Sequence, residues 1–183
     1  MNSSKQHRAP LLSLAFIAGL SAAVAGCTVS VEAEIPEVEI TQSGLAFPGV
    51  PDLGLGEVAV EKSFSQDHGK LDMPKGLDPE VKTLGVTVRV TSGAPDISFI
   101  HLLRLTMSDG KNAPVELGSY ERMPGDPLTK ELELAALNPL DVFEAWNTDS
   151  ATFTLQVAGT LPTADWTAEV SVRFSARAKY KYR

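Results

Sequence analysis

Hydrophobic and polar side chains alternate most regularly in the last segment of the chain. From position 166 to position 182 every even residue is apolar or aromatic and every odd residue is polar. An α-helix cannot keep a period of two on one face, whereas successive side chains of a β-strand point to opposite faces. The segment therefore predicts a strand. At about 3.3 Å per residue it would span roughly 55 Å, so it must bend, carry a bulge or project from the body.

Shorter runs with the same period occur along the rest of the chain. They lie at 29–35 (resuming after Pro36 with Val38 and Ile40), 58–64, 84–90, 97–107, 115–120, 132–134 and 153–157. The run at 97–107 has apolar residues on both parities, as in a central strand covered on both sides. Segments rich in Gly, Pro and Asp separate the runs and predict loops, the longest at 44–56 and 66–80.

One segment has a helical pattern instead. Asn138 and Pro139 suit the N-cap and the first position of a helix, and Leu140, Phe143 and Trp146 then share a face. We expect one or two turns near 139–146, covering an open end of the sheets. About eight short strands with little helix predict an all-β fold, an antiparallel β-sandwich of Greek-key or jelly-roll type.

The first 26 residues differ from the rest of the chain. They contain no acidic residue, Lys5 and Arg8 make them positive, and Leu11 to Gly26 are almost all apolar or small. This run is shorter than the ~20 residues that a membrane-spanning helix needs, and it ends in small residues. The pattern predicts a secretory signal peptide at 1–26 and an exported domain at 27–183.

Val24-Ala25-Gly26-Cys27 resembles the lipobox of bacterial lipoproteins, in which small residues precede a cysteine. The resemblance covers residues 1–27. It implies cleavage before Cys27, a diacylglycerol on its thiol and acylation, for example with palmitate, of the new amino group. Each buried CH₂ contributes about 0.8 kcal/mol, so two or three acyl chains anchor firmly. The alternative is a buried free cysteine. By resemblance to enteric lipoproteins, Thr28 in place of Asp implies the outer membrane.

The charge of the chain restricts its partners. It has 183 residues, with 16 Lys and Arg and 23 Asp and Glu, for a formal charge of −7. Loss of 1–26 would leave 157 residues with 14 basic and 23 acidic side chains, a charge of −9. Nucleic acid is not expected as a partner, because phosphate contacts need clustered positive charge. The single cysteine excludes an intrachain disulfide, and a chain of this length can bury a core without one.

Candidate catalytic residues are few. After the leader there are two histidines, and His101 lies within an apolar strand, where a structural role is expected. Asp67, His68 and Asp72 could bind a divalent cation, but their spacing matches no metal motif, so a solvated loop is favoured. There is no Gly-rich phosphate loop and no EF-hand spacing. We expect no cofactor, no metal and no catalysis.

Two tryptophans are candidates for stacking on sugar rings. Trp166 shares the parity of the apolar residues in the last strand, which favours the core. Trp146 ends the predicted helix, and we keep it as a possible ligand contact of a carbohydrate-binding module.

Opposite charges mark the first and last strands. The last strand carries a basic face that we treat as possible headgroup contacts: Arg173, Arg177, Lys179 and Lys181, with Arg183 at the end. The first strand carries an acidic face: Glu32, Glu34, Glu37 and Glu39. In sandwiches these strands are often neighbours, so we predict that the faces pair, at about 0.2–1 kcal/mol per pair. The alternative is contact with anionic lipid or lipopolysaccharide phosphate, at about 1 kcal/mol per basic group.

Together these features predict a lipid-anchored structural or binding module of the cell envelope. Its partners would be the bilayer, through acylated Cys27, and an envelope protein or polysaccharide. A carbohydrate-binding module is the alternative, and a metal-dependent hydrolase around His68 comes third. The patterned sequence begins at Val29, so the domain is expected close to the membrane. Fragments 96–100 and 161–166 resemble those of uncharacterised lipoproteins from predatory and social soil bacteria, which implies no functional residue.

Overall fold

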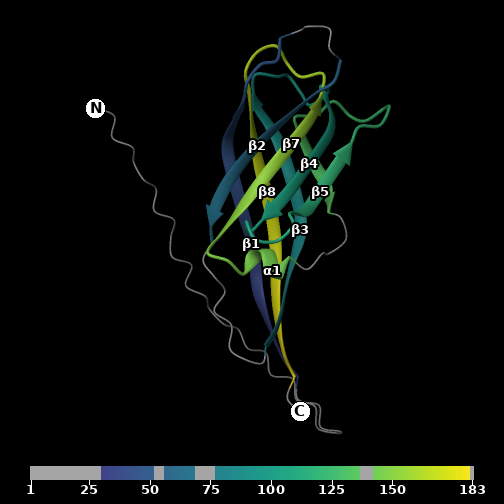
Figure 1. Ribbon diagram of the computed structural model, residues 1–183. Helices are drawn as coiled ribbons and strands as arrows, with labels where there is room; N and C mark the ends of the chain where they lie inside the picture. Colours follow the sequence, from purple (N-terminus) through teal and green to yellow (C-terminus); the bar gives the residue numbers. More distant parts are fainter. Residues whose placement is uncertain (1–29, 52–55, 69–76, 137–141, 182–183) are drawn as a thin grey trace, which may run out of the picture.

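The computed structural model describes residues 30–51, 56–68, 77–136 and 142–181. In these ranges the chain is almost entirely strand, with one helix of a single turn (Figure 1). The elements are β1 (Ser30–Phe47), β2 (Val58–Asp67), β3 (Leu77–Ser92), β4 (Ile100–Ser108), β5 (Val115–Glu121), β6 (Glu131–Ala136), α1 (Phe143–Trp146), β7 (Ser150–Gly159) and β8 (Trp166–Lys181). The predicted all-β fold is confirmed.

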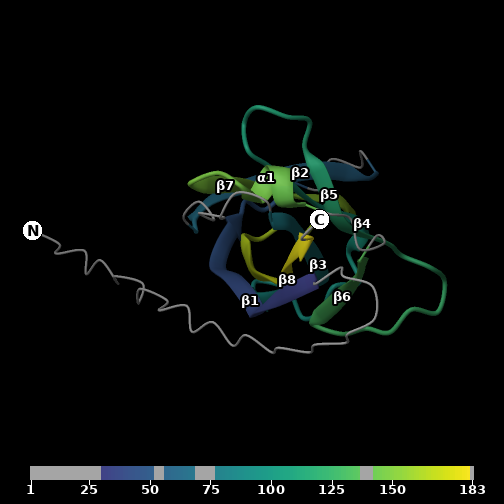
Figure 2. The ribbon, with the colours of Figure 1, turned by 90° about the horizontal axis from the view of Figure 1, so that it is seen from below.

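The strands form two four-stranded antiparallel sheets. One sheet has the order β1-β8-β3-β6 and the other β5-β4-β7-β2, and a two-residue ladder between β5 and β6 joins them at one edge. Strands pair in nested order, β1 with β8, β2 with β7, β3 with β6 and β4 with β5. This is the pairing of a long hairpin wound into a sandwich, so of the two predicted types the jelly roll is observed. Figure 2 looks along the sandwich.

The core lies between the two sheets and follows the predicted alternation. In β8 the even positions from Trp166 to Ala178 are buried, and in β7 the odd positions from Ala151 to Gly159 are buried. Trp166 is 1% exposed, and its ring stacks on Phe47 with centroids 4.2 Å apart. The prediction that Trp166 belongs to the core is confirmed, because its ring packs against Phe47 of β1 and, edge-on at 5.0 Å, against Phe99 in the turn before β4.

The long strand β8 has no bulge of its own, because the extra residues lie in the two strands that pair with it. It pairs with β1 on one side and β3 on the other, and each neighbour carries two bulges relative to it. In β1 the bulges lie between Ile35 and Val38 and between Gln42 and Leu45. A bulge bends a strand and increases its twist, so the three strands can curve together. Pro36 falls within the first bulge, where its missing N–H is tolerated.

A bulge in β3 overturns part of the predicted alternation. Between Thr83 and Gly85 one extra residue enters the strand, and Leu84 is 43% exposed. Before the bulge the buried positions are odd, and after it they are even, as at Val86. The prediction that Leu84 shares the buried face of Val86 was wrong, because an extra residue reverses every side chain that follows.

Three predicted boundaries were also wrong. Residues 44–47, expected in a loop, continue β1 and bury Leu45 and Phe47. Residues 77–80, expected in a turn-rich segment, begin β3. Residues 97–99 form a turn before β4, and that strand is buried on one face only, since Leu102 is half-buried. In each case tertiary pairing extended or shortened a strand beyond its local pattern.

The short helix α1 lies between the sheets at one end of the sandwich and contacts β3 and β7. The Val142 N–H donates to the Val81 carbonyl at 2.8 Å, and Trp146 packs against Phe174. A short helix that covers an open end is therefore confirmed. Its N-cap is Val142, with no capping side chain, so the helix begins later than predicted. Asn138 and Pro139 lie outside the described residues.

Three strands of the first sheet extend past the second sheet. Backbone pairing of β1, β8 and β3 continues to Ser30, Lys181 and Leu77, and in Figure 1 these ends converge below α1. We call this extension the stem, comprising residues 30–35, 77–82 and 176–181. The long final strand therefore projects from the body, one of the possibilities that its length predicted. The bulges lie in the strands that pair with it.

Candidate functional site

The outer face of β1 and β8 carries the predicted acidic and basic residues, and they face each other. Glu34 and Arg177 are backbone partners, and the Arg177 guanidinium lies 3.1 Å from a Glu34 carboxylate oxygen. Arg173 lies 3.3 Å from Glu37. The prediction that the first and last strands pair with opposite charges opposed is confirmed. These side chains are exposed, so each pair contributes modestly, and register is their main effect.

The stem adds carboxylates from β3 to this face. Lys82 lies 2.8 Å from Glu80, and its hydrogen bond lowers the pKa of Glu80. In backbone register Lys179 stands opposite Glu32 of β1 and Asp78 of β3. The basic stripe is thus surrounded by carboxylates of the same chain. Its contact with headgroups stays a prediction, and Arg183, Cys27 and the side chain of Lys181 lie outside the described residues.

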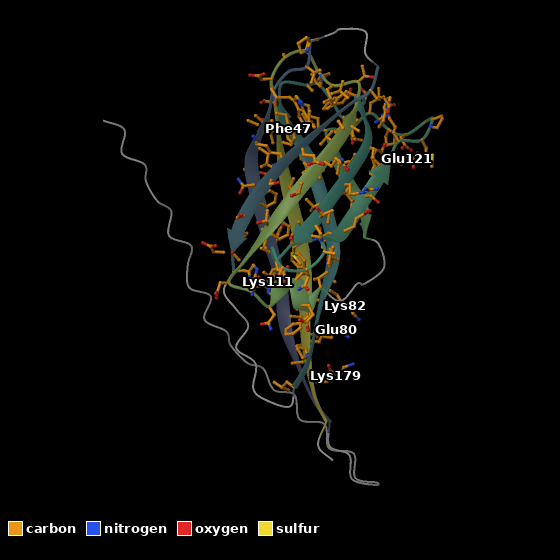
Figure 3. All side chains as sticks on the ribbon, viewed as in Figure 1. Phe47, Glu80, Lys82, Lys111, Glu121 and Lys179 are labelled. Carbon is orange, nitrogen blue, oxygen red and sulfur yellow. The ribbon has the colours of Figure 1, made fainter. Side chains whose placement is uncertain are left out.

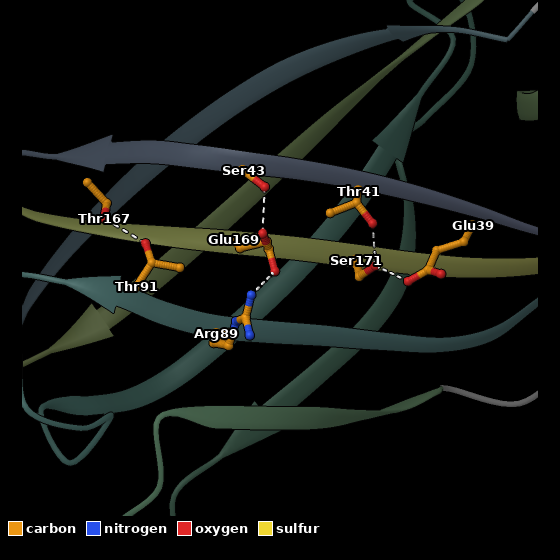
Figure 4. A network of polar contacts seen from close by, with 8 residues as sticks. All are labelled: Glu39, Thr41, Ser43, Arg89, Thr91, Thr167, Glu169 and Ser171. Atoms are coloured by element: carbon orange, nitrogen blue, oxygen red, sulfur yellow. Dashed lines mark hydrogen bonds and ion pairs between the residues drawn. The ribbon is translucent and has the colours of Figure 1, made fainter. Parts of the chain in front are cut away.

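Further along the same face, hydroxyl and carboxylate groups bridge the three strands (Figure 4). Glu169 of β8 accepts a hydrogen bond from the Ser43 hydroxyl at 2.5 Å and another from Arg89 at 2.6 Å. Both interactions lower its pKa, the Ser43 hydrogen bond most. Thr41 shares a hydrogen bond with Ser171 at 2.7 Å. These side chains hydrogen-bond to one another across the sheet. The arrangement therefore favours a role in holding the strands together over a role in ligand binding.

Trp146 does not offer a platform for sugar. It is 6% exposed, and its indole stacks on the His68 ring with centroids 4.4 Å apart. Because both rings pack over the end of the core, the prediction of Trp146 as a ligand contact was wrong. Asp72 lies outside the described residues. Within the described part of the chain, no group of three or more His, Cys, Asp or Glu side chains is placed to hold a metal ion.

A groove lies beside β4 and β5, at their Ile100 and Glu121 ends. Its volume is about 760 Å³. It is lined by acidic and apolar side chains together with a histidine and an arginine: Glu57, His101, Leu102, Glu121, Arg122, Met123, Pro124, Gly125, Asp126 and Leu128. Met123 is 61% exposed and Leu128 is 70% exposed. These two side chains give the groove an apolar surface that a partner could cover.

The loop that follows β5 is held in place by its own hydrogen bonds. The Asp126 carboxylate accepts from the Met123 N–H at 2.9 Å and from the Tyr120 hydroxyl at 2.8 Å. These two hydrogen bonds, the first most strongly, lower the pKa of Asp126. Burial raises the pKa of Tyr120, and its hydrogen bond to Asp126 raises it further. The loop is therefore a preorganised wall of the groove.

His101 belongs to this groove because of a bulge. Between Ile100 and Leu102 the register of β4 shifts, so His101 leaves the buried face and its Nδ1 contacts a Glu57 carboxylate oxygen. Its contact with Glu57, near the beginning of an interior strand, agrees with the structural role that the sequence favoured. The sequence did not single out the groove. The feature of the sequence that could have indicated the groove is the pair Met123 and Leu128, two large apolar residues in a segment otherwise rich in Pro, Gly and Asp.

Comparisons with known proteins do not assign a family. No family model matches the chain, and no curated protein matches it. The crystal structure of a decameric BFDV capsid protein is similar at 8% sequence identity and a TM-score of 0.36, over 83% of this chain and 99% of that chain. In the described residues no helix has the length and hydropathy to span a bilayer.

Proposed function

We propose that this protein is a lipid-anchored binding module of the bacterial cell envelope, held at the membrane through acylated Cys27. The observation that carries the proposal is the sequence Val24-Ala25-Gly26-Cys27 behind a positive and apolar leader. Two residues, Thr28 and Val29, separate Cys27 from the first residue of β1. An anchor at Cys27 would therefore hold the stem end of the domain against the bilayer.

The position of the groove supports a binding role over a purely structural one. Figure 3 places Glu121, on the groove, toward the opposite end of the molecule from Lys179 of the stem. The 16 residues of β8 between these ends correspond to about 50 Å of strand. A groove at this distance would face away from the lipid and remain open to a partner in the envelope space.

Acylation is tested directly by growing bacteria that produce the full chain with radioactive palmitate. We expect label in the purified protein, a shortened N-terminus that begins at Cys27, and recovery with the membrane fraction. The Cys27→Ser variant is expected to lack the label and to lose its membrane recovery, because Cys27 is the single cysteine of the sequence.

A matched control is Ser21→Ala, which changes the leader without touching the four residues of the lipobox. It should be labelled and processed like the natural chain. If Cys27→Ser is still processed at the same bond and recovered with membranes as completely as the natural protein, the anchor proposal is wrong.

A further inference from the structure

We infer that the groove beside β4 and β5 binds a cationic peptide segment of another envelope protein, one in which Lys or Arg adjoins apolar residues. This rests on the proposed function in that it names a partner for the binding module. The binding chemistry itself comes from the described residues of the groove and does not involve Cys27.

The exposed apolar side chains of the groove belong to the loop after β5. Among the described residues three large apolar side chains are exposed, and two of them, Met123 and Leu128, line the groove. The third, Leu84, lies at the bulge of β3 in the other sheet. Leu102 adds a half-buried apolar surface to the lining of the groove. Covering such side chains on binding removes apolar area from water, which is the main favourable term in association.

The charged side chains that line the groove favour a cationic partner. Glu57, Glu121 and Asp126 line the groove, against one arginine, Arg122, and His101, whose ring contacts Glu57. The Arg122 guanidinium is turned to the main chain and donates to the Ile97 carbonyl at 3.2 Å. Two of the three carboxylates, Glu57 and Glu121, are exposed. An ammonium or guanidinium group entering beside Met123 would meet these carboxylates at short range.

The groove needs little reorganisation to bind. The Arg122 N–H donates to the His101 carbonyl at 2.8 Å, and the Asp126 N–H donates to the Met123 carbonyl at 3.2 Å. Together with the Asp126 carboxylate these hydrogen bonds fix the loop before a partner arrives. Preorganisation lowers the entropy lost on association, so modest apolar contacts can give measurable affinity.

The test uses the chain from position 27 onward with Cys27→Ser, which contains every described strand and the helix. Its result is therefore independent of acylation. The probe is a short fluorescein-labelled peptide of the repeat Lys-Leu-Ser, and binding is followed by fluorescence anisotropy. Peptides of the repeats Glu-Leu-Ser and Lys-Ser-Ser remove the positive charge and the apolar residue in turn.

Two groove variants and two controls decide the outcome. Met123→Ser with Leu128→Ser should raise the Kd for the Lys-Leu-Ser peptide about tenfold, which corresponds to about 1.4 kcal/mol, and Glu121→Gln should raise it several-fold. Leu84→Ser, at the third large apolar side chain exposed among the described residues, and Glu61→Gln on β2 should change it by less than about twofold. Added salt should weaken binding, because it screens the carboxylates.

Three results would overturn the inference. They are the absence of binding of the Lys-Leu-Ser peptide, equally tight binding of the Glu-Leu-Ser peptide, and equal weakening by Leu84→Ser and the groove variants. Circular dichroism should show that each variant is folded, because the substituted side chains are exposed and the sheets should be unaffected. Palmitate labelling of Cys27 is a separate measurement, so failure of one proposal does not decide the other.

Discussion

Several carboxylates of this protein act as fixed acceptors within the surface. Asp126 accepts two hydrogen bonds in the loop after β5, and Asp109 accepts from the N–H groups of Lys111 and Asn112 in the turn after β4. In both cases the backbone N–H donors lower the carboxyl pKa, since they stabilise the ionised form. These residues shape their loops through charge-assisted hydrogen bonds.

Acid should loosen the groove loop through Asp126. Its native pKa lies below the ordinary value of 3.8, so its contribution to loop stability is present above that pH and is lost as the pH falls through the lower native value. In an NMR titration the Met123 amide should shift with a midpoint below pH 3.8. Asp126→Asn should remove this titration. A midpoint at or above 3.8 would contradict the assignment.

At the scale of elements, bulges decide which side chains face the core. The four bulges beside β8 all lie in its neighbours, β1 and β3. Each adds one residue, so each reverses the parity of the strand that follows it. The regular strand therefore kept its simple alternation, whereas the errors at Leu84 and at the ends of β1 and β3 fell on the strands that pair with it. The error in β4 arose in the other sheet.

The bulge at Leu84 gives a clear contrast in stability. Leu84→Ala should change the free energy of unfolding by less than about 0.5 kcal/mol, because the side chain is exposed. Val86→Ala should cost about 2 kcal/mol, since it leaves a cavity in the core. Urea denaturation measures both. Equal costs would mean that the bulge lies elsewhere in β3.

The pair of Glu34 and Arg177 should support the register of the stem. Arg177→Glu places like charges opposite Glu34 and should destabilise the fold by up to about 1 kcal/mol, less at high salt. Adding Glu34→Arg to that variant should recover part of the loss, since the charges are again opposite. Thermal unfolding of the single and double variants measures the coupling, and additive effects would show that the pair is not coupled.

At the scale of the whole molecule, the nested strand pairs set the positions of the two ends. β1 and β8 run antiparallel, so the beginning of the described chain and its end lie together at the stem. The groove, beside β4 and β5, lies toward the opposite end of the molecule. If Cys27 is acylated, one end of the sandwich meets the bilayer and the other faces away from it.

This orientation can be measured by energy transfer to an acceptor dye in the bilayer. A donor dye is placed on Lys179→Cys or on Glu121→Cys in the acylated protein reconstituted into vesicles. We expect strong quenching at position 179 and weak quenching at position 121, because the two lie toward opposite ends of the molecule. Equal quenching at both positions would show that the domain lies flat on the membrane.

The sequence alone determined the class of fold, because alternation with a period of two is a local property of strands. It also placed acidic residues on one face of the first strand and basic residues on one face of the last. The predicted anchor at Cys27 likewise depends only on local sequence. The fold class and the charged face of each strand depend on neighbouring residues along the chain, not on which strands pair across the sheet, and the anchor stays a prediction.

Only the tertiary structure decided which strands pair, where the bulges fall and which residues meet at the groove. Glu57, His101 and Asp126 come from separate segments, and Leu84 and His101 turn outward because of register shifts. Trp146 became a core residue because His68 and Phe174 pack on its ring. These outcomes depend on contacts between distant residues, and a pattern of local hydrophobicity does not contain them.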